Sequence, residues 1–332
     1  MANDLNVQVG AELGRAWARG RILAGGHTGV AGELLILDPM RRRLIAMSPD
    51  GSAVREVVTG LTEYPDGLAV DAERGWIYWT NMGRDWSART GSIERARLDG
   101  SGRGYVHPPG SFVTGKQLVL DTRSQSLFWC DREGMAIMRS SASGGDAEVL
   151  VRSGRYPQDS ADVRRHCVGI AVDTAEGVMY WTQKGAPKGG VGRIFRAGID
   201  IPRGQVADAR TDIETLWEEL PEPIDLELDH RGGLYWTDRG SAPTGNTLNH
   251  ADIPPPGRRG RTPKILISGM QEAIGLAIDA QDGAVFVADL GGHVYSVHPR
   301  VADSVRLVAA MPGSSFTGIC YLPSRSPEKG VA

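Results

Sequence analysis

Cysteine is scarce in this sequence, and so are long apolar runs and any excess of one charge. Three cysteines, Cys130, Cys167 and Cys320, are too few for the disulfide framework of a small secreted module, so we expect reduced, mostly buried thiols in a cytoplasmic protein. No apolar run approaches the roughly 18 residues of a membrane helix, and the polar start of the chain predicts no secretory signal. A formal charge of −3 gives no reason to expect nucleic acid or an anionic membrane as a partner.

Repetition is what the sequence has in abundance. A short aromatic motif recurs at intervals of about 50 residues, a period typical of propeller blades or solenoid units. Its copies are Tyr78–Asn81, Phe128–Asp131, Tyr180–Gln183, Tyr235–Asp238 and the degenerate Phe286–Asp289. Each copy follows a short apolar run that ends in aspartate, at 68–71, 118–121, 170–173, 226–229 and 276–279. Around the first copy, a tight turn at Gly75 joins the first two of three short strands and a turn at Gly100 ends the third, so each repeat predicts an antiparallel meander.

A sixth repeat is split between the two ends of the chain. Residues 34–38 and 43–52 supply later strands of a blade without a first strand, and residues 316–322 resemble the missing first strand. Pairing of the C-terminal strand (about 315–323) into the N-terminal blade closes the ring and removes its exposed edges. The sequence therefore predicts an all-β fold, a six-bladed β-propeller of four-stranded antiparallel blades over residues 32–324. Residues 1–31 form an N-terminal extension and residues 325–332 a tail.

The repeated Tyr-Trp-Thr-Asp motif, with Leu-Asp-Gly at 98–100, resembles the YWTD β-propeller family, the class B repeats of low-density lipoprotein receptors. That resemblance covers about residues 32–324 and implies the six-bladed architecture. Function stays open, because propellers host both enzymes and binding modules. Receptor propellers of the family are secreted and flanked by cysteine-rich modules, and neither feature is visible here. We therefore interpret the chain as a stand-alone intracellular member.

Uneven loops predict which face of the propeller carries function. The start of each first strand and the loop after each second strand share one face, which we call the top. Long loops of this kind occur at 81–91, 183–192 and 238–249, whereas those at 131–134 and 289–292 are minimal turns. Long loops on a rigid scaffold usually carry binding, so they predict a pocket at the top. In the N-terminal extension, Glu12 to Leu23 favours a short helix, either a collar beside the ring or a lid over the top.

Aligning the first strands predicts a ring of charged side chains where the central channel opens at the top. Glycine occupies most of the positions where a backbone crowds the channel, and Gln117 and Asp225 are the departures. The alignment also predicts an apolar floor of Val168, Ile224 and Ile274. The ionisable residues expected at the mouth are Asp66, Lys116, His166, Glu222, Asp225 and Glu272. Mixed charges in a desolvated ring perturb one another's pKa values, which marks a candidate functional site, although a structural ion-pair ring has the same composition.

Four of these residues are our catalytic candidates: Asp66, Lys116, His166 and Asp225. Asp66 or His166 would move a proton, and Lys116 would polarise an oxygen, form a Schiff base or serve only as an ion-pair partner. In the polar top loop, Trp86 with Arg84 is a candidate for gripping a flat substrate. The further candidates for substrate binding are Gln117, Arg132, Lys184, Glu222, Arg239, Glu272 and Thr317. The tryptophan and the closing aspartate of each repeat are better explained by blade packing and by bonds to turn amides.

The leading hypothesis is a small-molecule enzyme with a cofactor-free pocket at the top of the channel. Positioning and electrostatics suit a cyclisation, cycloaddition, condensation or lyase-type step, here assigned to specialised metabolism by analogy with other six-bladed propellers. One alternative is a metal-dependent lactonase or esterase of the gluconolactonase type with calcium in the channel, which Lys116 would oppose. The other alternative is a protein-binding propeller that uses its top loops. The sequence specifies neither the substrate nor the oligomeric state.

Overall fold

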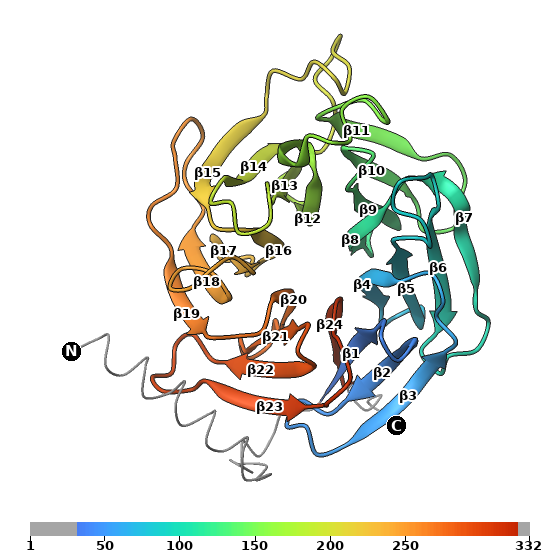
Figure 1. Ribbon diagram of the computed structural model, residues 1–332, viewed down its shortest axis with the longest axis vertical. Coiled ribbons are helices and arrows are strands. Elements are labelled where there is room, and N and C mark those ends of the chain that lie inside the picture. Colours follow the sequence, from blue (N-terminus) through green and yellow to red (C-terminus); the bar gives the residue numbers. More distant parts are fainter. Residues whose placement is uncertain (1–31, 325–332) are drawn as a thin grey trace, which may run out of the picture.

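Six four-stranded antiparallel sheets form the blades of a ring in the computed structural model, which describes residues 32–324 (Figure 1). The strands that lie innermost are β4 (Pro65–Asp71), β8 (Gly115–Asp121), β12 (Cys167–Asp173), β16 (Pro223–Leu228), β20 (Ala273–Ile278) and β24 (Ile319–Pro323). The second strands, which carry the repeated motif in five blades, are β5 (Trp76–Asn81), β9 (Ser126–Asp131), β13 (Val178–Gln183), β17 (Gly233–Asp238), β21 (Val285–Asp289) and, in the split blade, β1 (Gly32–Asp38).

The outer two strands complete each blade. The third strands are β6 (Gly91–Arg97), β10 (Ala136–Ser141), β14 (Gly192–Gly198), β18 (Thr247–Asp252), β22 (His293–Val297) and β2 (Arg43–Met47). The fourth strands are β7 (Gly104–Phe112), β11 (Glu148–Arg152), β15 (Glu214–Leu220), β19 (Lys264–Ser268), β23 (Arg306–Ala310) and β3 (Val54–Thr59). We number the blades 1 to 6 in chain order from the blade that contains β1. A 3₁₀ turn, η1 (Val163–Arg165), precedes the first strand of blade 4.

The ring closes as predicted, by pairing of the two ends of the propeller. β24 is antiparallel to β1, with Gly32 opposite Pro323 and Ile36 opposite Ile319. Blade 1 therefore has the strand order β24-β1-β2-β3. The expected helix at Glu12 to Leu23 and the tail at 325–332 lie outside the described residues. Between residues 32 and 324 no helix is long and apolar enough to cross a membrane.

Tryptophan side chains from the second strands fill the spaces between neighbouring blades. The ring of Trp129 in blade 3 packs against Phe112 from blade 2, with 5.5 Å between centroids. Trp236 in blade 5 packs in the same way against Trp217 from blade 4, at 5.2 Å. All four tryptophans of the repeat are buried, which confirms their structural interpretation. Sheets joined through large apolar side chains form a rigid frame for the loops at the top.

Backbone crowding at the centre of the ring explains the glycines at the starts of the first strands. A Cβ atom on Gly169 would lie 2.1 Å from the carbonyl oxygen of Ile224 in the next blade. One on Gly67 would lie 2.5 Å from the carbonyl oxygen of Lys116. Distances this short admit no side chain, so the predicted reason for glycine is confirmed. The cysteines also follow the prediction, because all three are free thiols and Cys130 and Cys167 are buried.

Candidate functional site

An apolar cluster lies where three of the innermost strands begin. Val168, Ile224 and Ile274 form one buried cluster, with Leu290 packed against it. These three residues come from β12, β16 and β20, the innermost strands of three successive blades, so they meet near the axis of the ring (Figure 1). This cluster is the predicted apolar floor. Val168, Ile224 and Ile274 stand at the positions that Asp66, Lys116 and Thr317 occupy in the other three blades.

Lys116 and Asp66 form a buried ion pair between blades 2 and 3. The Lys116 Nζ atom donates a hydrogen bond to Asp66 Oδ2 and lies 3.6 Å from the Met82 sulfur. Burial lowers the pKa of Lys116, the Asp66 charge opposes that effect, and the positive charge of Arg132 lowers the pKa further. The second carboxylate oxygen, Asp66 Oδ1, is buried and has no hydrogen-bond partner among the described residues. One acceptor of this pair is therefore left for a donor from outside the described residues.

A second charge network lies across the top of blades 4, 5 and 6. Glu222 accepts from Lys184 Nζ at 3.1 Å, from Arg239 Nε at 2.8 Å and from the Lys188 amide at 2.9 Å. Arg239 also lies 3.6 Å from Glu272. Burial would raise the pKa of Glu222, but the Lys188 amide and the two cations outweigh it and hold the pKa below its usual value. Burial lowers the pKa of Lys184. Four of the predicted binding residues are thus brought together as one network.

His166 and Asp225 occupy the mouth in different ways. The His166 Nε2 atom lies 2.9 Å from the Ser160 carbonyl oxygen and therefore carries the proton in this bond. Burial lowers the pKa of His166, which favours the neutral imidazole. Asp225 bridges two blades, because its oxygens accept from the amides of Leu226 and Leu276, each at 3.0 Å. Burial raises the pKa of Asp225 well above its usual value. The contacts of Asp225 therefore tie first strands together.

Two further predicted residues complete the ring. Thr317 donates from Oγ1 to the Pro65 carbonyl oxygen at 3.1 Å, so it links β4 to the segment before β24. Gln117 is buried, and its Nε2 atom has no partner among residues 32–324. The mouth therefore contains an unpaired acceptor on Asp66 and an unpaired donor on Gln117, residues whose strands β4 and β8 are neighbours.

An exposed aromatic pair stands above this ring. Trp86 and Tyr64 are each 47% exposed, and their rings meet edge to face at 6.2 Å. The guanidinium of Arg132 lies 5.6 Å from the centre of the Trp86 ring. Arg84, the predicted companion of Trp86, instead donates to Thr62 at 3.1 Å. Arg132 also influences the pKa values of both Lys116 and His166, so it lies between the aromatic pair and the buried ring.

Sequence reasoning missed Glu227, on the first strand of blade 5. Its charge raises the pKa values of Asp225 beside it and of Cys320 on β24, which is not a neighbour of β16 in the ring. Glu227 therefore faces the interior of the ring, and burial raises its pKa to about 7. A signal was present, because Glu227 is the acid among equivalent positions that hold small or apolar side chains. Those positions are Ala69, Val119, Ala171, Ala277 and Cys320.

The carboxylates at the mouth are a poor set of calcium ligands. Asp66 is paired with Lys116, Glu222 with two cations, and Asp225 with two amides. No three His, Cys, Asp or Glu side chains within 32–324 are grouped so that they could hold a metal ion. Calcium needs six to eight oxygens around one point, and these oxygens do not converge.

We therefore expect calcium to leave the melting temperature unchanged. The purified chain would be heated with added Ca²⁺ and with EDTA, and the two melting temperatures compared. If a site bound calcium and the calcium concentration were one hundred times the Kd of that site, binding would add about 2.7 kcal/mol to the free energy of unfolding. The resulting rise in melting temperature is easily measured. A chelator-sensitive shift of several degrees would support the lactonase-type alternative instead.

Comparisons with known proteins show both relatives and structural neighbours. The chain is 47% identical over 266 residues to "Low-density lipoprotein receptor-related protein 1" of Pyricularia oryzae, which covers 77% of this chain and 84% of that protein. It is 39% identical over 281 residues to a "3-hydroxyacyl-CoA dehydrogenase-like protein" of Cochliobolus heterostrophus, covering 80% of this chain. The match spans only 58% of that second relative's length. No protein-family model matches the chain.

Solved structures share the fold at low sequence identity. A chain of a nidogen/laminin complex superposes with a TM-score of 0.67 at 19% identity, over 89% of this chain and 99% of that chain. A luciferin-regenerating enzyme superposes with a TM-score of 0.56 at 12% identity, over 77% of this chain and 79% of that chain. At such identities the likeness shows the propeller fold alone. One neighbour comes from a protein complex and the other is an enzyme, so the fold by itself does not choose between the two functions.

Proposed function

The chain belongs to the YWTD-repeat β-propeller family, and from that premise we propose that it is a small-molecule enzyme with its pocket at the top of the channel. The reaction class is a cofactor-free cyclisation, cycloaddition, condensation or lyase-type step. The dehydrogenase-like name of the Cochliobolus relative supports a role in metabolism, although this chain spans 58% of that protein.

One observation carries the proposal: a buried, charged pair at the mouth with polar atoms left without partners. Asp66 Oδ1 and Gln117 Nε2 are buried and unpaired among the described residues. A buried polar atom without a partner costs about 1–3 kcal/mol, so such atoms mark places where a substrate or water completes the bonding. A purely structural ion-pair ring would be expected to satisfy both of them.

The chemistry follows from the positions of these groups. The Lys116 ammonium, held by Asp66, would donate to a substrate oxygen and stabilise the negative charge that develops on it. Asp66 Oδ1 would accept a proton from the substrate and return it to the product, so the step is balanced without a cofactor. Neutral His166 and the cation Arg132 would orient the ligand, and Trp86 would stack on it.

A panel of α,β-unsaturated carbonyl compounds tests the proposal. Compounds that raise the melting temperature would be incubated with the wild type and their products analysed by mass spectrometry. The double variant Lys116→Met/Asp66→Leu, which removes both charges together, should lose about 100-fold or more in kcat/KM while keeping the fold. Undiminished turnover by this variant, or no turnover of any compound by the wild type, would contradict the assignment.

A protein-binding function is the second candidate, and the exposed pair of Tyr64 and Trp86 favours it. The name of the Pyricularia relative also refers to a receptor-related protein. Trp86→Ala tests whether Trp86 contacts the substrate of the enzyme or a protein partner. If Trp86 grips the substrate, the variant raises KM about 10-fold with a smaller effect on kcat, in line with the loss of one aromatic contact. If Trp86 serves a protein partner, both constants stay at wild-type values.

A further inference from the structure

A cavity of about 390 Å³ lies between blades 3 and 4, to one side of the channel mouth. Its apolar wall includes Trp181 and Phe195, whose rings are stacked at 5.3 Å with 15° between their planes. Its polar rim contains four arginines and one aspartate, namely Arg152, Arg164, Arg165, Arg193 and Asp162. A volume in this range holds a small organic molecule.

The register of the sheets explains why this space is open. On the fourth strand of blade 2, His107 pairs with Ile93 and packs on Trp129 of blade 3, with ring centroids 5.3 Å apart. On the fourth strand of blade 4, Trp217 occupies the same position and packs on Trp236 of blade 5.

In blade 3 that position is Val151, which pairs with Ile137 and shares a core cluster with Trp181. Valine is much smaller than histidine or tryptophan. An aromatic side chain fills this space between blades 2 and 3 and between blades 4 and 5. Between blades 3 and 4 a cavity remains beside Trp181 instead.

The charges around the cavity do not balance. Asp162 is shared by Arg164 at 2.9 Å and Arg165 at 3.3 Å, and Arg152 lies 3.2 Å from Asp208. Arg193 has no carboxylate within salt-bridge distance among the described residues, and the partners of its Nη2 atom are neutral oxygens.

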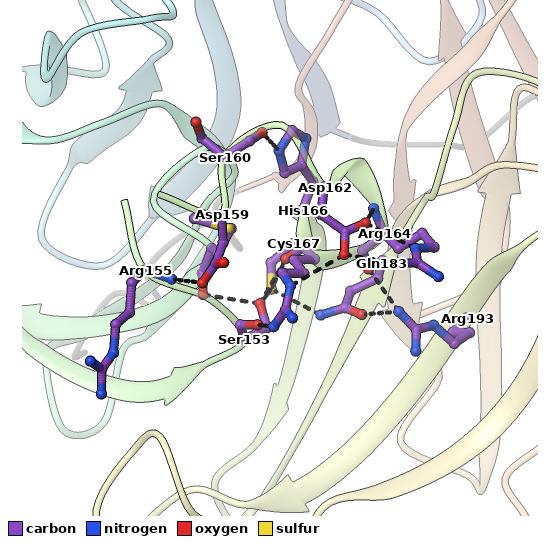
Figure 2. Close-up of polar contacts among 12 residues, drawn as sticks. Ser153, Arg155, Asp159, Ser160, Asp162, Arg164, His166, Cys167, Gln183 and Arg193 are labelled. Carbon is purple, nitrogen blue, oxygen red and sulfur yellow. Dashed lines mark hydrogen bonds and ion pairs between the residues drawn. The ribbon is translucent and has the colours of Figure 1, made fainter. Parts of the chain in front are cut away.

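Those partners are the Arg164 carbonyl and Gln183 Oε1, each at 2.7 Å (Figure 2). The remaining donors of the half-buried guanidinium have no acceptor from this part of the chain. Burial lowers the pKa of Arg193, and the neighbouring positive charge of Arg164 adds to that effect. A half-buried cation of this kind attracts an anion.

We propose that this cavity is a second ligand site, which takes a small organic carboxylate with a flat apolar body. The carboxylate would accept a charge-assisted hydrogen bond from a free donor of Arg193, on Nε or Nη1, and the body would lie against the stacked rings of Trp181 and Phe195. Arg193 itself lies 5.1 Å from the centre of the Phe195 ring, so the charged and the aromatic surfaces adjoin. The site shares no lining residue with the channel mouth and goes beyond the proposed enzymatic function.

Calorimetric titration with 2-naphthoate tests this site. We expect one molecule to bind per chain, whereas the neutral isostere 2-naphthamide, acetate and inorganic phosphate bind at least about tenfold more weakly, because the amide lacks the charge and the two small anions lack the apolar body. Arg193→Gln should weaken 2-naphthoate binding about tenfold or more. Val151→Trp, which introduces the side chain found at the same position in blade 4, should fill the cavity and abolish binding.

Two controls separate this site from the rest of the molecule. Arg139→Gln removes an arginine of blade 3 that is paired with Glu148 and Asp200, and it should leave 2-naphthoate binding unchanged. The channel-mouth variant Lys116→Met/Asp66→Leu should also bind as the wild type does. Equal binding of 2-naphthamide, tighter binding of phosphate, unchanged binding to the Arg193 variant, or no binding of 2-naphthoate to the wild type would each overturn the proposal.

Discussion

Replacing Lys116 by methionine is expected to lower the free energy of unfolding by about 3–5 kcal/mol, because the Asp66 carboxylate would remain buried without its cation. The side chain of Asp66 is 2% exposed, so water solvates its charge poorly and the ammonium is its main source of stabilisation. Chemical denaturation at neutral pH measures the change. A loss of less than about 1 kcal/mol, which is typical of an exposed ion pair, would contradict the buried geometry.

The double variant Lys116→Met/Asp66→Leu is the matched control for that result. Replacing both members of a buried pair by apolar side chains is often neutral or stabilising, so most of the lost stability should return. Stability and activity then report separate properties. A folded double variant without turnover would assign a catalytic role to the pair, whereas a folded and fully active one would assign it a structural role alone.

The wild type is expected to lose stability as the pH rises, and the variant Glu227→Gln is expected not to. The ordinary pKa of a glutamate is about 4.3, and burial raises that of Glu227 to about 7. Between these values the folded protein binds more protons than the unfolded chain, so the free energy of unfolding falls with rising pH. Glutamine stays neutral throughout. At about pH 8 the free energy of unfolding of the variant should exceed that of the wild type by about 3–4 kcal/mol, and near pH 4 the two should agree.

Denaturant titrations at a series of pH values measure this difference. Glu227→Leu provides a second test at the same position, because it also removes the charge without depending on a new hydrogen bond. Both variants should flatten the same part of the pH profile. A wild-type slope retained in both of them would show that another group titrates there.

Repetition made the fold predictable from sequence alone. Five copies of one strand pattern identified blades 2 to 6, and the first-strand signal near Phe316 correctly predicted how the ring closes. The apolar floor was predictable for the same reason, since equivalent positions in successive blades meet at the axis. Residues that recur in the repeats have structural roles. Asp131, for example, accepts hydrogen bonds from the amides of Thr114 and Gly134, as expected for a residue found in most repeats.

The site was predictable only as a set of residues. The alignment predicted that Lys116 and Asp66 lie in the same ring. Which cation pairs with which carboxylate depends on side-chain conformations, and these cannot be predicted from the repeats. Arg132 lies over Trp86 where Arg84 was expected, because Arg84 turns to Thr62. The cavity beside Trp181 was missed for another reason, since an ordinary valine at Val151 reveals a gap only when the strand register is known.

Closure of the ring through β24 and β1 also determines when the first blade can be completed during synthesis. The partner of Ile36 is Ile319, so the sheet that the ribosome begins first is the last to be completed. Until residue 323 emerges, β1 presents an open edge, and neighbouring nascent chains on a polysome present the same edge to one another. Burial of that edge therefore waits until β24 has been synthesised. Any stop codon before β24 would yield a product that can pair with other molecules but not with itself.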